Sequence, residues 1–262
     1  MLAYGWFEAG WVRLRVRVVE VPGLPAELDG LRIAHLSDFH LGVPSRGVQA
    51  VRRAVAWTVE RAVEWVAERR PDLVCVTGDL LSRPRGEARL RELLERLGHP
   101  YVVLGNHDLA VSRDPFSRPA VLESVEHGTL LSDTSVELEL RGCRVELAGV
   151  DPRSWIDRRS SDLGPAAADV RILLCHFPTA LRRVPPGRWS LILAGHLHGG
   201  QIVLPYGFGK LLLAHPRAPY SDGVYRRGST VMHVSPGLGT TFVPFRFFAR
   251  PEATELVLRS AG

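Results

Sequence analysis

The sequence is short of side-chain amides and of lysine. Among its 262 residues Asn106 is the only asparagine, Gln49 and Gln201 are the only glutamines, and Lys210 is the only lysine. Asn106 lies in the stretch Leu104–Asp108, directly after a short apolar run. An amide oxygen there would coordinate a metal ion without adding charge, but asparagine, glycine and aspartate also favour ordinary turns. This stretch alone leaves a metal site and a plain turn both open.

Other scarcities exclude whole classes of protein. The three cysteines, Cys75, Cys143 and Cys175, are an odd and widely spaced set. They argue against a disulfide framework and against a structural zinc site built from C-x-x-C pairs. No apolar run approaches the ~20 residues that a membrane span needs. The first residues contain no basic stretch before an apolar core, as a signal peptide would have, so we expect a cytoplasmic protein.

The overall composition is that of a soluble globular protein. Hydrophobic residues make up 45% and charged residues 23% of the chain, which suits a sizeable core. We expect one domain over 1–262, with 1–28 as an N-terminal strand segment and 202–262 as a closing segment of the same domain. The net charge of +5 suits phosphate-bearing partners. The arginines are scattered, however, which also fits a compositional bias, and we expect no stable nucleic acid partner.

Hydrophobic periodicity predicts alternating strands and helices in the first half of the chain. Alternation over 11–20 predicts a half-buried edge strand. Short apolar runs predict buried strands over 31–36, 73–76 and 101–104. Apolar residues spaced by three and four predict amphipathic helices over 45–70 and 87–97. Strands that alternate with helices in this way predict parallel strands joined by crossover helices.

The second half predicts another layer of sheet. Apolar alternation on both sides of Arg141 and Gly142 predicts an antiparallel hairpin over 136–150. Further strands are predicted over 170–175, 191–194, 231–234 and 254–258. The stretch 202–222 is rich in glycine, proline and aromatic residues, and we expect it to be irregular and to cover a site. His35, inside a predicted strand, is interpreted as a core histidine and not as a ligand.

Polar residues that can bind metals follow five of the predicted strands. They are Asp38, His40, Asp79, Asn106, His176, His196 and His198. In parallel sheets the site lies outside the carboxyl ends of the strands, which is where these residues fall. Carboxylates, imidazoles and an amide suit manganese, iron or zinc. Seven ligands exceed the need of one ion and suit two ions sharing a carboxylate, roughly 3.5–4 Å apart.

In their order and spacing these residues resemble the calcineurin-like metallophosphoesterase superfamily. All five motif blocks of the superfamily are present, from Asp38-x-His40 to Gly195-His196-x-His198. The tail stretches Val234–Gly239 and Pro251–Glu252, with Arg246, are similar to the YkuE/YaeI-like bacterial phosphodiesterase branch. The resemblance implies an α/β fold, a four-layer α/β/β/α sandwich with two mixed sheets.

The resemblance also implies a set of roles. Four residues would hold the first metal: Asp38, His40, Asp79 and His198. Asp79 would bridge to a second metal completed by Asn106, His176 and His196. His107 would protonate the leaving group or stabilise the transition state, with Asp108 orienting its ring. The implied activity is a phosphoesterase with two divalent ions (manganese, iron or zinc), which hydrolyses phosphodiester or pyrophosphate bonds by attack of a metal-bridging hydroxide.

Two other functions stay open at this point. A binding or scaffold protein on the same fold would have lost ligands or the histidine of Gly-Asn-His, and this chain keeps them all. A nuclease would show a contiguous basic stripe and a steep salt dependence. The resemblance suggests a small phosphate ester, a phospholipid or a UDP-linked lipid as substrate. Trp6, Phe7 and Trp11 could make weak peripheral contact with a membrane or simply pack on the sandwich. The sequence does not predict an oligomeric state.

Overall fold

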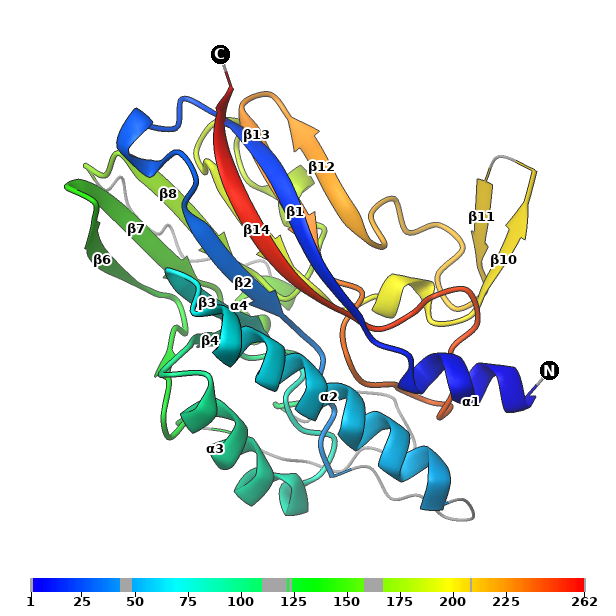
Figure 1. Ribbon diagram of the computed structural model, residues 1–262. Coiled ribbons are helices and arrows are strands. Elements are labelled where there is room, and N and C mark those ends of the chain that lie inside the picture. Colours follow the sequence, from blue (N-terminus) through cyan, green and yellow to red (C-terminus); the bar gives the residue numbers. More distant parts are fainter. Residues whose placement is uncertain are drawn as a thin grey trace.

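The computed structural model of the chain describes residues 2–42, 49–109, 122, 124–157, 167–207 and 209–261. Its strands form two six-stranded sheets that pack face to face, together with a separate two-stranded hairpin (Figure 1). Both sheets are mixed, because each combines parallel and antiparallel neighbours. The expected pair of mixed sheets is therefore confirmed.

The first sheet joins both ends of the described chain. In spatial order its strands are β1 (Arg13–Pro22), β14 (Glu252–Ala261), β2 (Arg32–Leu36), β3 (Leu73–Thr77), β4 (Tyr101–Val103) and β5 (Thr129–Leu130). The alternating stretch β1 lies at the sheet edge, as predicted, and runs parallel to β14. From β2 to β5 the strands are parallel, so the carboxyl ends of β2, β3 and β4 meet at one end of the sandwich.

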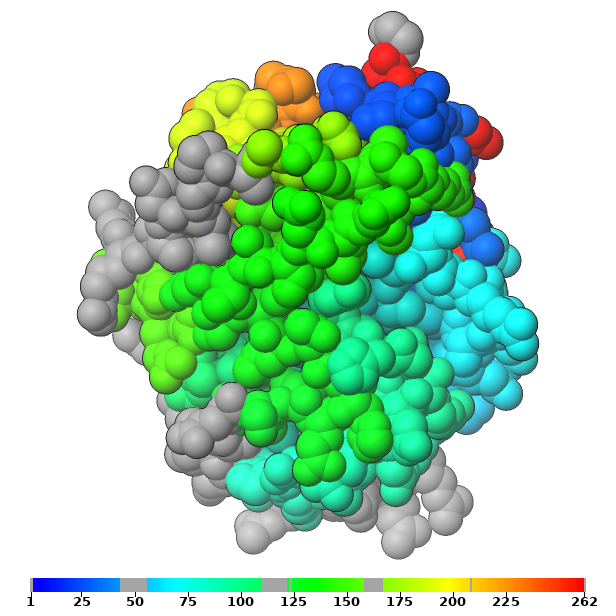
Figure 2. Space-filling view, turned by 90° about the vertical axis from the view of Figure 1, so that its left-hand side faces the viewer, coloured from blue at the N-terminus to red at the C-terminus, as the bar shows by residue number. Residues whose placement is uncertain are grey.

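The second sheet mirrors this arrangement. In spatial order its strands are β12 (Gly223–Arg227), β13 (Thr230–Val234), β9 (Leu191–Ala194), β8 (Val170–Leu174), β7 (Cys143–Gly149) and β6 (Thr134–Leu140). The predicted hairpin is β6–β7, and the strands from β7 to β13 run parallel. The face in Figure 2 is formed largely by the green segments that include this hairpin. The remaining strands, β10 (Val203–Tyr206) and β11 (Gly209–Leu212), pair only with each other.

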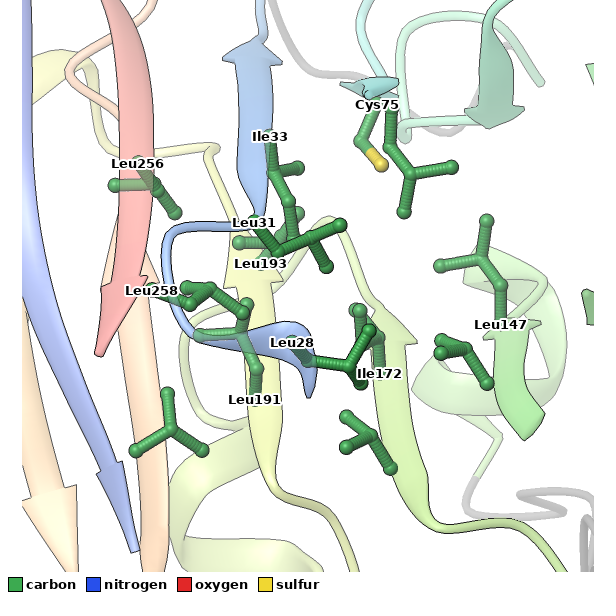
Figure 3. Packing of buried hydrophobic residues seen from close by; sticks show 14 of the residues in the cluster. Leu28, Leu31, Ile33, Cys75, Leu147, Ile172, Leu191, Leu193, Leu256 and Leu258 are labelled. Carbon is green, nitrogen blue, oxygen red and sulfur yellow. The ribbon is translucent and has the colours of Figure 1, made fainter. Parts of the chain in front are cut away.

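Apolar side chains fill the space between the sheets and the space under the outer helices. Figure 3 shows the inner cluster, in which Ile33, Leu256 and Cys75 from the first sheet face Ile172 and Leu193 from the second. The helices α2 (Gln49–Arg69) and α3 (Glu87–Arg96) cover the outer face of the first sheet. The short helices α4 (Pro152–Ile156) and α5 (Ala180–Arg183) lie on the outer face of the second. These four layers match the expected sandwich, with a thinner helical layer on the second sheet.

Two elements differ from the sequence prediction. Residues 2–10, expected within a strand segment, form helix α1 (Leu2–Gly10), which contacts α2 where Thr58 Oγ1 donates to Ala9 O at 3.2 Å. Residues 203–212, expected to be irregular, form the β10–β11 hairpin. The predicted helix over 45–70 begins at Gln49 within the described residues, and its first part lies outside them. No helix of the described chain is long and apolar enough to cross a bilayer.

Candidate metal centre

The predicted metal ligands lie in the loops that follow β2, β3, β4, β8 and β9. Six of them fall into two groups, in each of which the ligand atoms lie within 4.8 Å of one another. The first group is Asp38, His40, Asp79 and His198, and the second is Asp79, His176 and His196. Asp79 belongs to both groups, which is the geometry that a bridging carboxylate requires.

The spacing of ligand atoms within each group fits a bound ion. In the first group His198 Nε2 lies 3.1 Å from His40 Nε2 and 3.4 Å from Asp38 Oδ1. In the second group His176 Nε2 lies 3.1 Å from His196 Nδ1. Ligands that each stand about 2.1 Å from one ion are separated from one another by roughly 3.0–3.4 Å. Each group therefore has the size of a coordination shell.

Two buried oxygen atoms at the centre have no hydrogen-bond partner among the described residues. They are Asp38 Oδ1 and Asn106 Oδ1. Burying a carboxylate or amide oxygen without a partner is costly, and a cation would remove that cost. Asn106 directly precedes His107, and the backbone N–H of His107 donates to Asp79 Oδ1 at 2.9 Å, so the loop that carries Asn106 is bonded to the shared carboxylate. These donors fit one or two divalent cations.

The backbone at the centre is held in an uncommon conformation. Asp38, His40, Asp79, His196 and His198 all have positive φ, between 50° and 79°. For residues other than glycine this region is sparsely populated, and it persists only where the surrounding structure enforces it. Such strain is concentrated at functional sites in proteins. Here these residues lie just after β2, β3 and β9, where their side chains enter the two ligand groups.

Glycine allows the loops to approach closely. A Cβ atom at Gly195 would collide with Ser37 Oγ and with Asp38 Oδ2. A Cβ atom at Gly105 would collide with the carboxylate and the backbone nitrogen of Asp79. Both glycines directly precede predicted ligands or their neighbours in the motif blocks. Their lack of a side chain lets the loop after β9 approach the loop after β2, and the loop after β4 approach the loop after β3.

Hydrogen bonds from outside the ligand groups orient two of the imidazoles. His176 Nδ1 lies 2.7 Å from Thr77 O. A carbonyl only accepts, so Nδ1 keeps its proton, and Nε2 is the atom that can coordinate once it has lost its own proton. His40 Nδ1 lies 2.9 Å from Ser82 Oγ, which orients that ring with Nε2 towards the first group. Thr77 and Ser82 are supporting residues that the sequence analysis did not single out.

Among the described residues Arg246 is the largest fully buried side chain, and it supports the loop that carries His198. Its Nη1 donates to His198 O at 3.2 Å and to Pro236 O at 2.8 Å, and its Nη2 lies 3.2 Å from His198 Nδ1. Further bonds reach the carbonyls of Gly237, Gly239 and Ala249. The sequence analysis noted Arg246 as part of a resemblance but gave it no role.

Burial and charge set the protonation of the imidazoles. Burial lowers the pKa of His196 to about 3, and it lowers the pKa values of His40 and His198 well below the ordinary value. These rings are therefore neutral, as metal ligands must be. Burial also disfavours the charged form of His176, but the carboxylates of Asp79 and Asp38 outweigh it and raise its pKa to about 9. Metal binding at His176 should therefore release a proton.

His107 and Asp108 lie beside the ligand groups. His107 is 5% exposed, its Nε2 lies 3.9 Å from Asp79 Oδ2, and its ring packs edge-on against His40 with centroids 4.7 Å apart. The Asp108 carboxylate accepts the N–H groups of Gly105, Leu80 and Leu81 at 2.8–3.1 Å. Asp108 thus ties the loops after β3 and β4 together, a role that sequence reasoning missed. Its assignment as the partner that orients His107 stays a prediction.

The buried histidine His35 lies outside the centre, as the sequence analysis expected. Its Nδ1 lies 2.7 Å from His233 Nδ1, and its Nε2 lies 2.9 Å from Thr77 Oγ1. Both histidines are fully buried between the sheets, and burial lowers the pKa of each. They form a neutral pair in the core, and the interpretation of His35 as a core histidine is confirmed.

Comparison with known proteins agrees with this geometry. Residues 31–200 match the model of the calcineurin-like phosphoesterase family. The chain is 29% identical to the metallophosphoesterase YkuE of Bacillus subtilis, over 91% of this chain and 82% of YkuE. It is 25% identical to the phosphodiesterase YaeI of Escherichia coli, over 97% and 89% of the two chains.

A vertebrate relative is longer than this chain. The transmembrane protein with metallophosphoesterase domain of Danio rerio is 34% identical over 93% of this chain, which spans 57% of that protein. The family model covers well over half of the residues, and it includes every predicted metal ligand. The chain belongs to the calcineurin-like phosphoesterase family.

Proposed function

We propose that this protein is a phosphoesterase that uses two divalent metal ions to hydrolyse phosphodiester or pyrophosphate bonds. The observation that carries the proposal is the shared position of Asp79, which belongs to both ligand groups. A one-metal enzyme would have no use for the second group, in which two histidines from the loops after β8 and β9 join Asp79. The unpartnered oxygens of Asp38 and Asn106 support the same conclusion, because Asp38 belongs to the first group and Asn106 would supply a fourth ligand to the second.

The residues present fit manganese, iron or zinc. Asp38, His40 and His198 would complete the first site with Asp79, and the remaining ligands would complete the second. Mixed nitrogen and oxygen ligands without thiolate suit these ions better than magnesium or calcium. Two such ions would acidify water and neutralise the charge on the phosphoryl oxygens.

His107 is placed to act on the leaving group. Its backbone N–H is anchored on Asp79 and its ring is packed against His40, so the imidazole is held at the rim of the ligand groups. A proton delivered by His107 to the departing oxygen would avoid the release of an unstable alkoxide. This need is greatest for diesters whose leaving groups are poor.

Aromatic side chains form a wall next to the second ligand group. The Phe177 ring packs edge-on against His176 and His196, with centroids 5.2 Å and 4.8 Å apart. His215, from the segment after β11, lies 6.4 Å from His196 by ring centroids. These residues would contact the group esterified to the phosphate, and they favour a substrate with a second substituent over a simple monoester.

A three-substrate comparison tests the function. Protein loaded with manganese, iron or zinc should hydrolyse bis(p-nitrophenyl) phosphate with a higher kcat/KM than p-nitrophenyl phosphate, and should be tested on a nucleotide pyrophosphate in parallel. Asp79→Asn should abolish the activity, while His99→Asn at an exposed turn should leave it unchanged. Preference for the monoester, or activity that survives in Asp79→Asn, would contradict the proposal.

A further inference from the structure

Helix α1 presents an apolar surface that no described residue covers. Leu2, Tyr4, Phe7 and Trp11 are exposed there, together with the adjoining Phe248. Phe7 is 59% exposed and packs against Trp11 with ring centroids 5.3 Å apart, while Tyr4 packs against Phe248 at 6.0 Å. We call these five residues the α1 patch. Contiguous exposed aromatic surface of this kind marks an interaction site more often than isolated exposed residues do.

The β10–β11 hairpin presents a second apolar surface. Val203 and Leu212 are buried at its base, whereas Leu204, Tyr206 and Leu211, together with Leu213 just after the hairpin, are exposed. Leu204 and Leu211 are direct cross-strand partners. We call the four exposed residues the hairpin patch. In Figure 1, α1 and the hairpin both project from the right-hand side of the molecule, away from β6 and β7.

One segment fixes both patches relative to the metal centre. Phe247 N donates to Gln201 O at 2.9 Å and Val203 N donates to Phe247 O at 2.9 Å, which ties the base of the hairpin to this segment. The next residue, Phe248, belongs to the α1 patch, and the preceding one, Arg246, donates to His198 O at 3.2 Å. The two patches and the first ligand group are therefore joined through three consecutive residues.

Both patches lack exposed acidic side chains. Glu8 is the only acid of α1, and it is buried, where its carboxylate accepts the backbone N–H groups of Phe248 and Ala249. Between Leu191 and Pro251 the sequence contains a single acid, Asp222. Basic residues flank the patches instead. Arg250 lies over the Trp11 ring at 3.5 Å. Lys210 lies within the hairpin and forms an ion pair with Asp222 at 3.5 Å.

Aromatic and aliphatic side chains flanked by arginine and lysine, with Asp222 as the single acid beside the hairpin, complement an anionic lipid surface. Apolar side chains enter the boundary between head groups and acyl chains, and basic side chains bind the lipid phosphates. A site that binds another protein would have no reason to be poor in acidic residues from Leu191 to Pro251, whereas a surface that binds anionic lipid would. We propose that the α1 patch and the hairpin patch together bind an anionic bilayer surface. The metal centre then faces lipid head groups. Its phosphoester substrate then comes from a membrane lipid, an inference that rests on the proposed function.

Vesicle co-sedimentation tests the surface separately from catalysis. The metal-loaded full chain is mixed with phosphatidylcholine vesicles that either contain or lack phosphatidylglycerol, at low and at physiological salt. Phe7→Ser combined with Phe248→Ser removes two of the five side chains of the α1 patch, and Leu204→Ser combined with Leu211→Ser removes two of the four of the hairpin patch. Val18→Ser is the control, because Val18 is 67% exposed on the edge strand β1 and belongs to neither patch.

We expect binding to vesicles that contain phosphatidylglycerol, and a partition coefficient lower by roughly tenfold or more in each double variant. Val18→Ser should bind like the unmodified protein, and Arg250→Ser should bind about fivefold more weakly. Absence of binding to anionic vesicles, or binding that neither double variant weakens, overturns the proposal. A dimer in lipid-free solution that the double variants dissociate also overturns it, because the occupant is then a second copy of the chain.

Hydrolysis of the soluble bis(p-nitrophenyl) phosphate by the same samples separates the two proposals. We expect the double variants to hydrolyse it at the unmodified rate, since no patch residue is placed in the metal centre. Vesicle binding by a protein that hydrolyses no phosphoester would support the lipid surface and contradict the proposed function. Hydrolysis without vesicle binding would support the proposed function and contradict the lipid surface.

Discussion

Replacing Arg246 with methionine removes a fully buried guanidinium while keeping a side chain of similar length. The guanidinium donates to five backbone carbonyls, those of His198, Pro236, Gly237, Gly239 and Ala249. A buried acceptor left without its donor costs about 1–3 kcal/mol. The methionine variant no longer has to bury a charged group, and this gain offsets part of the loss. We therefore expect Arg246→Met to lower the free energy of unfolding by about 4 kcal/mol, a large share of the ~5–15 kcal/mol of a typical domain.

Urea denaturation in the presence of a chelator measures this effect without a contribution from bound metal. Arg246→Lys should lose roughly half as much, since an ammonium group has three donors and can satisfy some of the carbonyls. Arg226→Met is the matched control, because Arg226 lies at the surface in an ion pair with Glu20 at 3.7 Å. The control should lose at most about 1 kcal/mol.

The metal content of the same variants completes the test. Arg246 contacts both the backbone carbonyl and the ring of His198, so variants that fold should bind the ion of the first group more weakly. An Arg246→Met protein within about 1 kcal/mol of the unmodified chain and with full metal content would refute the reasoning. The loop of His198 would then be held by other contacts.

Three further predictions concern a salt bridge, the proton donor and a loop contact. Burial alone would raise the pKa of Glu255, but hydrogen bonds from Arg69 and a second arginine outweigh it and lower the pKa to about 2, from an ordinary 4.5. The carboxylate therefore stabilises the fold above pH 4.5 and loses this effect as the pH falls towards 2. Glu255→Gln should lower the free energy of unfolding, measured by urea denaturation, by about 3 kcal/mol at pH 7 and by far less near pH 2. His107→Asn should lower kcat roughly 10²–10⁴-fold with the metal content unchanged, and a parallel loss of metal would make His107 a ligand. Gly195→Ala should displace Asp38 and lower metal content and activity together, as measured by elemental analysis, whereas normal metal binding would show that the loop can give way.

The sequence was sufficient to predict the strands that carry the ligands. Each ligand follows a short apolar run, and the runs alternate with amphipathic helices, so their carboxyl ends had to converge. The loops after β2, β3, β4, β8 and β9 are where the predicted ligands lie. The resemblance to the family supplied the pairing into two groups, which the distances around Asp79 match.

Elements held by tertiary contacts alone were not predictable. Helix α1 contains Gly5 and several aromatic residues, which are weak helix formers. It forms against the segment 245–250, where Phe247 lies over Gly5 and Glu8 accepts two backbone N–H groups. The β10–β11 hairpin is likewise tied to Phe247 through Gln201 and Val203. These contacts join residues more than 40 positions apart, so no periodicity in the local sequence could have predicted them.

Arg246 was beyond sequence reasoning for a related reason. A single arginine among scattered arginines looks like a surface residue, because arginine is almost never fully buried without a partner. Its partners here are backbone carbonyls of loops, which have no signature in the sequence. The role of Asp108 in joining two loops through N–H groups is hidden in the same way.

The number of metal ions bound per chain tests the central claim most directly. Protein saturated with manganese and freed of excess metal should contain two ions per chain by elemental analysis. His196→Ala, which affects only the second group, should retain one ion, whereas Asp79→Asn should weaken both sites because Asp79 is shared. A stoichiometry that stays at one ion after saturation, or an Asp79→Asn protein that binds two ions as tightly as the unmodified chain, would contradict the account.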